Sequence, residues 1–285
     1  MSNKQINSYT ILRLIAASVL CMSYGATVQA AILDLSTAGT SGSINGALFY
    51  EASDVAWGGG TAVEYATFQR LGNSTSPTGV SHGYNTDGVD QYDNASANNF
   101  SIHLSAVPTF TINGTIYREF VFDANETKGA ATQLLSLDKI EIYISNSSTL
   151  TGHSDLTGFG SAANLVFDLD TGPDGDSWIK LDGGGGSGSR DILMYIDDTL
   201  FTNNAVDGVA DPYLHIYSMV GSEGDDPKSK TYNGLGNDGN GKESWAHAPN
   251  GVAVGPPVPL PPAVWLFGSG LVGLFSYSKR KKLAS

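Results

Sequence analysis

The stretch LDKIEIYIS at residues 137–145 gives the clearest information about the fold. Isoleucine stands at every second position from 140 to 144, and Glu, Tyr and Ser occupy the alternate positions. Successive side chains of a β-strand point to opposite faces, so this alternation predicts a strand with one apolar face and one solvent-exposed face. We therefore expect a β-sheet that packs on a core through its isoleucine side.

Similar short segments run through the body of the chain, separated by loops rich in Gly, Asn, Asp and Ser. The strand candidates are residues 31–35, 47–51, 63–69, 100–107, 109–113, 117–123, 164–168, 178–181, 191–197 and 213–220. No part of the body shows a 3.6-residue apolar repeat longer than two turns. This pattern predicts an all-β fold, as a β-sandwich or jelly-roll-like ectodomain over residues 31–220.

A polar segment rich in Gly, Asn and Asp follows this domain at residues 221–255. Its composition predicts a linker, with Trp245 as a residue able to pack back onto the domain. No Gly-rich phosphate-binding pattern opens a helix in this chain, so the sequence disfavours a nucleotide-binding α/β domain.

Residues 1–30 have the pattern of a secretory signal peptide. Early cations precede a short apolar core at 14–22, which is about half the roughly 20 residues of a spanning helix. Val28 and Ala30 supply the small residues that signal peptidase requires, so we expect cleavage before Ala31. Cleavage removes the single cysteine of the chain, which suits an exported protein.

Residues 256–285 combine a proline-rich stretch, an uncharged apolar segment that predicts a single transmembrane helix, and a basic tail. As a helix, residues 260–278 would be about 28 Å long, enough to cross the hydrocarbon core of a bilayer. Trp265 and Tyr277 stand near the two ends of this segment, where interfacial aromatic residues are common. The cations Lys279, Arg280, Lys281 and Lys282 then predict a cytoplasmic tail, with the preceding chain outside.

This arrangement resembles the PEP-CTERM sorting signal of Gram-negative bacteria, in a VPLPA-like variant, over about 25 residues. The matching proline motif is Val258, Pro259, Leu260, Pro261 and Pro262. The commonest form has Glu where this chain has Leu260, and the named variant has Ala where it has Pro262. The resemblance implies recognition by an exosortase, a membrane enzyme that processes such signals.

Together, the two ends predict an exported precursor that is tethered to the inner membrane in the periplasm and then reaches the cell surface or extracellular matrix. Its expected partners are the Sec export machinery, signal peptidase, an exosortase, the inner membrane transiently, and exopolysaccharide. The expected function is that of a surface or matrix protein rather than an enzyme. A carbohydrate-binding module of the exopolysaccharide matrix is one alternative, and a secreted hydrolase using Ser81 is the other.

The hydrolase alternative rests on residues 79–83, which match the G-x-S-x-G pattern of a nucleophile elbow. That chemistry needs Ser81 on a sharp turn between a strand and a helix. The flanking residues carry neither a strand nor a helix signal, so we expect a surface loop and assign no catalytic residue.

A calcium site is a further hypothesis, because four carboxylates occur in one short segment bent by two glycines. They are Asp168, Asp170, Asp174 and Asp176. Carboxylate oxygens are the ligands that Ca²⁺ prefers, although the spacing is not that of an EF-hand. The alternative is a solvated acidic turn between strands. No other cofactor is expected, because the five histidines lack zinc-site spacing.

The charge balance divides the chain into parts with different roles. The formal net charge is −13, but six of the 15 cations lie in residues 1–30 and 261–285, which hold no acidic residue. The body therefore carries nine cations and all 28 acids, a net charge of −19. This balance excludes a nucleic-acid binder, which needs clustered Lys and Arg, and the single cysteine excludes a disulfide scaffold.

Overall fold

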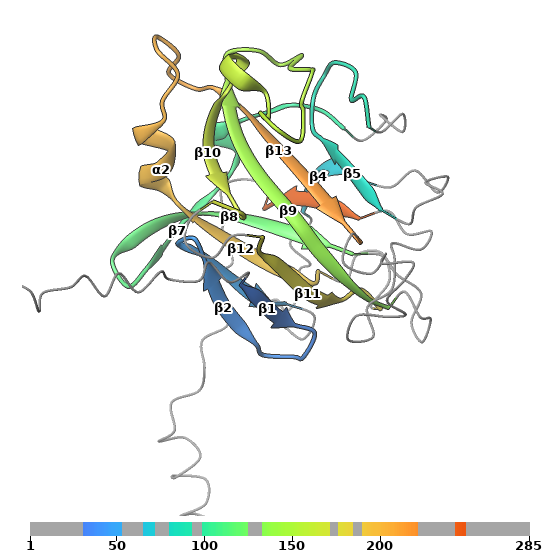
Figure 1. The fold of residues 1–285 in the computed structure, drawn as a ribbon. Helices are drawn as coiled ribbons and strands as arrows, with labels where there is room; N and C mark the ends of the chain where they lie inside the picture. The colour runs from blue at the N-terminus through green and yellow to red at the C-terminus, as the bar shows by residue number, and fades with distance from the viewer. Residues whose placement is uncertain are drawn as a thin grey trace, which may run out of the picture.

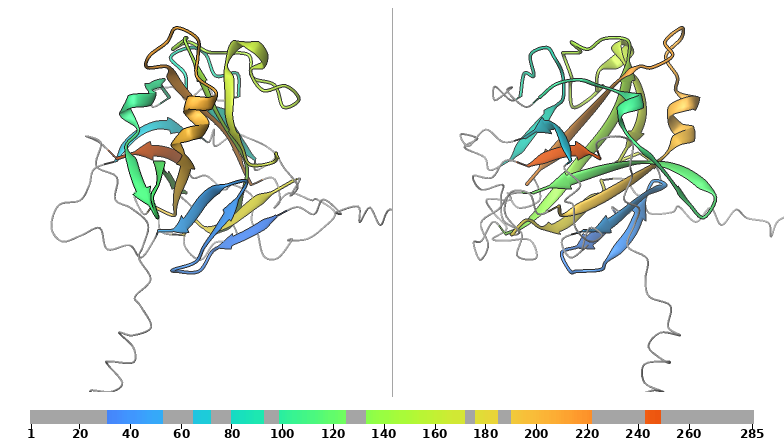
Figure 2. Two further views of the ribbon diagram at one scale, coloured as in Figure 1. Left: turned by 90° about the vertical axis from the view of Figure 1, so that its left-hand side faces the viewer. Right: turned by 180° about the vertical axis from the view of Figure 1, so that it is seen from behind.

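The computed structural model describes residues 31–52, 65–71, 80–92, 99–124, 133–171, 176–184, 190–221 and 243–248. In these residues the chain forms two β-sheets that pack face to face (Figure 1, Figure 2). The prediction of an all-β, sandwich-like domain is confirmed, whereas the finer assignment to a jelly roll stays a prediction. The predicted signal peptide and sorting segment lie outside the described residues, among which no helix is long and apolar enough to cross a membrane.

The first sheet is built around the long strand β9. Its strand order is β1 (Ile32–Leu35), β11 (Trp178–Asp182), β9 (Leu134–Ser145), β13 (Tyr213–Val220) and β5 (Ser81–Tyr84). Because β9 has 12 residues, one of its edges accommodates both β11 and β10 (Asn164–Asp168), while β13 follows the other edge. The short strand β6 (Ile102–His103) pairs with β13, and β1 runs parallel to β11.

The second sheet is built around β8 and β12. Its strand order is β2 (Ser41–Ile44), β3 (Ala47–Glu51), β12 (Ile192–Asp197), β8 (Thr115–Asp123), β14 (Ser244–His247) and β4 (Ala66–Arg70). The strand β7 (Thr109–Ile112) also pairs with β8. The turns of the β2–β3 and β7–β8 hairpins are Asn-Gly pairs with positive φ at both residues, the preferred chemistry of a two-residue hairpin.

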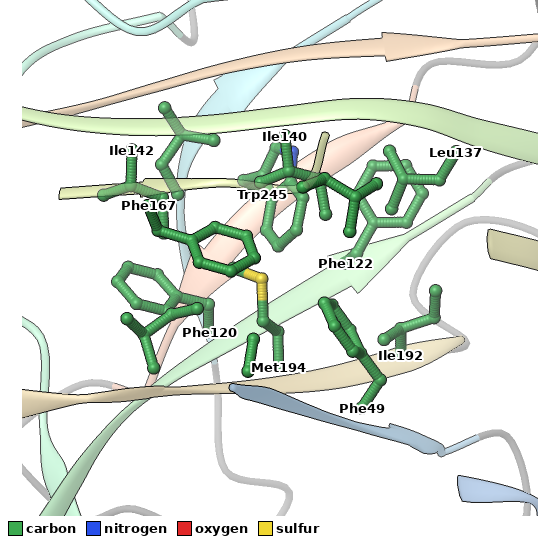
Figure 3. Close-up of a cluster of buried hydrophobic side chains, with 14 of the residues drawn as sticks. Phe49, Phe120, Phe122, Leu137, Ile140, Ile142, Phe167, Ile192, Met194 and Trp245 are labelled. Atoms are coloured by element: carbon green, nitrogen blue, oxygen red, sulfur yellow. The ribbon is translucent and has the colours of Figure 1, made fainter. Parts of the chain in front are cut away.

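Alternating apolar side chains of both sheets form the core. Figure 3 shows Ile140 and Ile142 of β9 above Phe120 and Phe122 of β8, with Trp245 of β14 between the layers. These side chains are completely buried. The helical segments of the described residues are short: the 3₁₀ turns Leu104–Ala106 and Gly160–Ala162, and α2 (Asp198–Asn203), whose Phe201 packs into this core. Burial of alternate residues from two facing sheets is the arrangement that the isoleucine pattern predicted.

Several predictions about individual segments are wrong. Residues 100–107 form a strand only at 102–103 and then a 3₁₀ turn, and the strands β2, β5 and β14 were not predicted. Residues 244–247 were expected in the linker but form β14, which lies between β8 and β4. The folded domain therefore extends to Ala248, because its second sheet needs a strand that follows the Gly-rich segment.

The prediction that one face of β9 is exposed to solvent is also wrong. Glu141, Tyr143 and Ser145 are each at most 5% exposed, so both faces of this strand are covered. The cover comes from two loops, residues 85–92 after β5 and residues 146–163 between β9 and β10, which lie side by side at one end of the first sheet (Figure 1). This covered outer face contains the polar cluster described next.

Candidate functional site

The strongest candidate site lies on the outer face of the first sheet. Strands β9, β13 and β5 bring Glu141, Tyr217 and Tyr84 side by side on this face, because these residues are opposite one another in the strand register. The loop 146–163 then places His153 above them. Gly158, with φ of +55°, passes so close to the sheet that a β-carbon there would overlap the hydroxyl of Tyr143. The site therefore joins three strands and a covering loop.

Glu141 is the centre of the site. Its Oε2 lies 2.8 Å from Nε2 of His153 and also accepts a hydrogen bond from the hydroxyl of Tyr143. Its Oε1 lies 3.0 Å from Nζ of Lys139. Because both carboxylate oxygens accept hydrogen bonds from strong donors, the buried charge of Glu141 is well compensated.

The electrostatics of these groups follow from burial and from their partners. Burial by itself would raise the pKa of Glu141, but the hydrogen bonds from His153 and Tyr143, followed by the charge of Lys139, lower the pKa overall. Burial and the bond to Glu141 raise the pKa of Tyr143. Glu141 is therefore an ionised acceptor at neutral pH, and Nε2 of His153 carries the hydrogen of their bond.

Aromatic rings enclose His153. Its imidazole stacks on the ring of Tyr217 with centroids 3.8 Å apart, and it packs edge-to-face with the ring of Phe159 at a centroid distance of 5.0 Å. Tyr84 contributes a third ring at 6.1 Å. The backbone carbonyl of His153 accepts hydrogen bonds from Gln91 and Tyr92 of the other loop. This residue therefore fastens both covering loops to the sheet.

The rim of the site is less buried than its centre. His82 of β5 lies against Tyr92, with ring centroids 4.2 Å apart, and its Nδ1 is 3.1 Å from the hydroxyl of Tyr217. That hydroxyl donates to Asp155 at 3.3 Å. Burial lowers the pKa of His82, and burial together with the charge of Asp155 raises the pKa of Tyr217.

Chemically, this arrangement holds a loop in place. Both oxygens of Glu141 accept hydrogen bonds from side chains of the fold, two on Oε2 and one on Oε1, so this carboxylate joins the strand to the covering loop. Solvent reaches the rim, where His82 and Tyr92 are half-buried and Asp155 is exposed. We interpret the centre as a polar anchor and the rim as the part of the site able to contact another molecule.

Replacing His153 by Ala should lower the free energy of unfolding by about 2–3 kcal/mol, because a hydrogen bond to a buried charge and a stacked ring are both lost. Urea denaturation followed by circular dichroism measures this change. His103→Ala is the matched control, since that imidazole pairs with Asp211 on the surface and should contribute less than about 0.5 kcal/mol. Equal effects of the two variants would contradict the anchor role.

Ser81, the residue of the hydrolase alternative, lies outside this cluster. It is the first residue of β5, pairs with Val220 and is 6% exposed. The expected surface loop is therefore wrong from residue 81 onward, while Gly79 lies outside the described residues. A nucleophile elbow needs a helix directly after the serine, and the described residues 81–92 continue as a strand and a loop.

The predicted calcium ligands are only partly described, because Asp174 lies outside the described residues. Oδ1 of Asp168 accepts the backbone N–H of Asp170 at 2.9 Å, and Oδ1 of Asp170 accepts the backbone N–H of Ser177 at 3.1 Å. Among the described residues, no three His, Cys, Asp or Glu side chains are grouped so as to hold a metal ion. The calcium site stays a prediction.

The anchor residues Glu141 and His153 were not predicted as a site. The alternation predicts that a carboxylate between two core isoleucines is solvent-exposed, and the 12-residue separation gives no local sign of contact with a histidine. The predicted sorting residues at 258–262 and the cations at 279–282 lie outside the described part of the chain. Comparisons with protein-family models, curated proteins and solved structures find no match.

Proposed function

We propose that this chain is an exported surface or extracellular-matrix protein, processed at both ends, whose two-sheet domain is the delivered product. One observation carries the proposal: a proline motif, an apolar segment and a basic tail follow one another in residues 256–282. Such an order halts a translocating chain in the membrane and leaves the proline motif at its outer surface. An exosortase is the processing enzyme that the PEP-CTERM-like pattern suggests.

The extent of the domain supports this proposal. Its first strand begins at Ile32, directly after the expected cleavage site, and its last described strand ends at His247, before the prolines. Removal of both predicted signals therefore leaves every described strand in place. The body that remains is strongly acidic, which favours solubility outside the membrane and contacts with neutral polymers or cations.

A binding or structural role fits the described residues better than hydrolysis does. Ser81 is buried in a strand, and Glu141 is buried and bonded to Lys139, His153 and Tyr143. Carbohydrate binding, the first alternative, would use partly exposed aromatic residues. Tyr50, Tyr117 and Phe110 lie together on the outer face of the second sheet, are partly exposed and present rings that are suited to stacking on sugars.

The protein isolated from its native host should begin at Ala31 and lack the tail Lys279, Arg280, Lys281 and Lys282. Signal peptidase cleaves after small residues, and an exosortase would remove the segment after the proline motif. Intact-mass spectrometry of the surface or matrix fraction measures both ends at once.

A matched control replaces the three prolines Pro259, Pro261 and Pro262 by Ala, which leaves the apolar segment and the basic tail unchanged. This variant should keep its tail and stay in the membrane fraction. A retained tail in the unmodified protein would rule out C-terminal processing and leave a membrane-anchored protein instead.

A further inference from the structure

A stripe of aromatic side chains crosses the outer face of the second sheet diagonally. Its members come from four neighbouring strands: Tyr50 of β3, Tyr195 of β12, Tyr117 of β8 and Phe110 of β7. Tyr117 lies directly opposite Phe110 in the β7–β8 hairpin, which projects from the side of the domain (Figure 1). With strands about 4.8 Å apart and a rise of about 3.4 Å per residue, this aromatic stripe is about 20 Å long.

A buried pair of side chains supports one end of the aromatic stripe. Tyr195 and Glu119 are completely buried, and the hydroxyl of Tyr195 donates to Oε2 of Glu119 at 2.8 Å. The partly exposed ring of Tyr50 packs edge to face on the ring of Tyr195, with centroids 5.7 Å apart. Tyr50 is therefore held in place before a ligand binds, which reduces the conformational entropy lost on binding.

The exposed members of the stripe suit a ligand that has both apolar and polar surface. Tyr50, Tyr117 and Phe110 are partly exposed, and a tyrosine combines apolar ring faces with a polar hydroxyl. A sugar ring has matching chemistry, because its C–H bonds pack on an aromatic face while its hydroxyls form hydrogen bonds at the edge. A lipid tail offers no partner for the tyrosine hydroxyls. Since the stripe spans four strands, it fits successive rings of a polysaccharide better than a single sugar.

Two carboxylates lie on the same face of the sheet as the rings. Asp197 is opposite Tyr117 in the strand register, and Glu119 is opposite Tyr195. Asp197 is partly exposed, so its negative charge acts on a ligand that lies at Tyr117. The body of the chain, with nine cations and 28 acids, repels anionic polymers and also a second copy of itself.

A cation already lies on a ring at the margin of this face. The guanidinium of Arg190 lies over the ring of Tyr65, 4.3 Å from its centroid, and Tyr65 packs against the same outer-face cluster. Aromatic faces attract cations because their π electrons carry negative charge. Rings and carboxylates on one face are therefore complementary to a ligand that carries positive charge.

We propose that the aromatic stripe binds a polysaccharide with free amino groups. The sugar rings stack on Tyr50, Tyr117 and Phe110. An ammonium group of the polymer pairs with the carboxylate of Asp197. This inference rests on the proposed function, because a surface or matrix protein meets such polymers outside the cell, and it names the ligand class for the carbohydrate-binding alternative.

The test measures the affinity of the full chain, purified in detergent, for chitohexaose, a linear oligomer of glucosamine. Isothermal titration calorimetry is carried out at about pH 6, where amines are protonated and carboxylates are ionised. Two control ligands separate the two contributions. Fully N-acetylated chitohexaose keeps the sugar rings without the charges, and hexalysine keeps the charges without the sugar rings. Each control should bind at least about tenfold more weakly than chitohexaose, because it lacks one contribution.

Variants of the stripe locate the binding site. Phe110→Thr and Tyr117→Thr each remove an exposed ring and keep a residue that favours strands. Each should weaken chitohexaose binding about fivefold to tenfold, the usual effect of one aromatic contact. Tyr213→Thr is the matched control, because that partly buried ring belongs to the first sheet and lies 4.3 Å from the ring of His103. It should leave the affinity unchanged.

A second pair of measurements tests the carboxylate and avoids the loss of a ring. Asp197→Asn keeps a side chain able to cap α2 and should weaken binding of chitohexaose but not of its N-acetylated form. In the unmodified protein, bound chitohexaose should slow the nitration of Tyr50 and Tyr117 by tetranitromethane and leave that of Tyr213 unchanged. Peptide mass spectrometry measures these rates, which remain informative if a ring variant does not fold.

Absence of binding to chitohexaose would overturn the inference, and so would equal affinities for chitohexaose and either control ligand. Unchanged binding in the ring variants together with unprotected Tyr50 and Tyr117 would also overturn it. Self-association of the chain that the ring variants abolish would assign this face to a second copy instead. Processing of the host protein is measured separately by mass, so failure of the proposed function and failure of this inference are distinguishable.

Discussion

Trp245→Ala should lower the free energy of unfolding by about 3–5 kcal/mol, the usual cost of truncating a large buried aromatic residue. Trp245 is 0% exposed and lies between the sheets, where its ring is 4.9 Å from that of Phe122 (Figure 3). Its Nε1 donates a hydrogen bond to Oγ of Ser218 at 3.0 Å. The residue also holds β14 between β8 and β4, so its loss should weaken the whole edge of the second sheet.

Urea denaturation followed by tyrosine fluorescence and circular dichroism measures this change. Ser218→Ala is the matched control, because it removes the hydrogen bond and keeps the packing, and it should cost only about 1 kcal/mol. Trp245→Phe should lie between the two variants, since it keeps an aromatic ring. A loss below about 1 kcal/mol for Trp245→Ala would mean that residues 244–248 contribute little to the domain.

Asp191→Asn should stabilise the protein at neutral pH and abolish a decrease in stability between about pH 4 and pH 8. Burial, followed by the charge of Asp123, raises the pKa of Asp191 to about 8. Its Oδ2 accepts the backbone N–H of Ala124 at 2.6 Å, whereas Oδ1 has no hydrogen-bond partner in the described part of the chain. An asparagine keeps an acceptor for Ala124 without the buried charge.

The sign of this pH dependence of stability follows from proton linkage. A carboxyl group whose pKa is raised by folding binds its proton more tightly in the native state than in the unfolded state. Its contribution therefore favours folding at low pH and is lost as the pH rises from about 4, its unfolded value, to about 8. At about 1.4 kcal/mol per pKa unit, the full difference has an upper bound of about 6 kcal/mol.

Unfolding free energies at pH 4, 6 and 8 measure this linkage. The variant and the unmodified protein should be equally stable at pH 4 and differ by about 2–5 kcal/mol at pH 8. Asp207→Asn is the matched control, because that side chain is exposed and should leave the pH dependence unchanged. A constant difference between Asp191→Asn and the unmodified protein at all three pH values would contradict the linkage.

Most strand positions were predicted well from local sequence. The segments predicted at 47–51, 109–113 and 213–220 correspond closely to β3, β7 and β13. The weakest strands were missed because their residues carry little strand propensity: β2 reads Ser-Gly-Ser-Ile and β5 reads Ser-His-Gly-Tyr. Their positions depend on pairing with stronger strands, which supply the hydrogen bonds and the register.

The candidate site was less predictable than the strands for a related reason. Glu141 and Tyr143 have the spacing of a solvent-facing side, and the same spacing fits a side that a distant loop covers. Only the packing of residues 146–163 and 85–92 distinguishes the two arrangements. The loop 146–163 folds back over β9 and brings His153 to Glu141. The periodicity of the sequence carries no information about that contact.

By itself, the sequence determined the acidic charge of the chain and indicated its all-β fold, and it predicts export signals at both ends, because charge, alternation and end signals are local properties. The tertiary structure decided which polar residues are buried, that a strand after the Gly-rich segment completes the second sheet, and which aromatic rings share its outer face. Those features arise from contacts between residues far apart in the chain. The stretch at 137–145 therefore predicted a strand and its apolar face, while the loops that fold over it decided the environment of the other face.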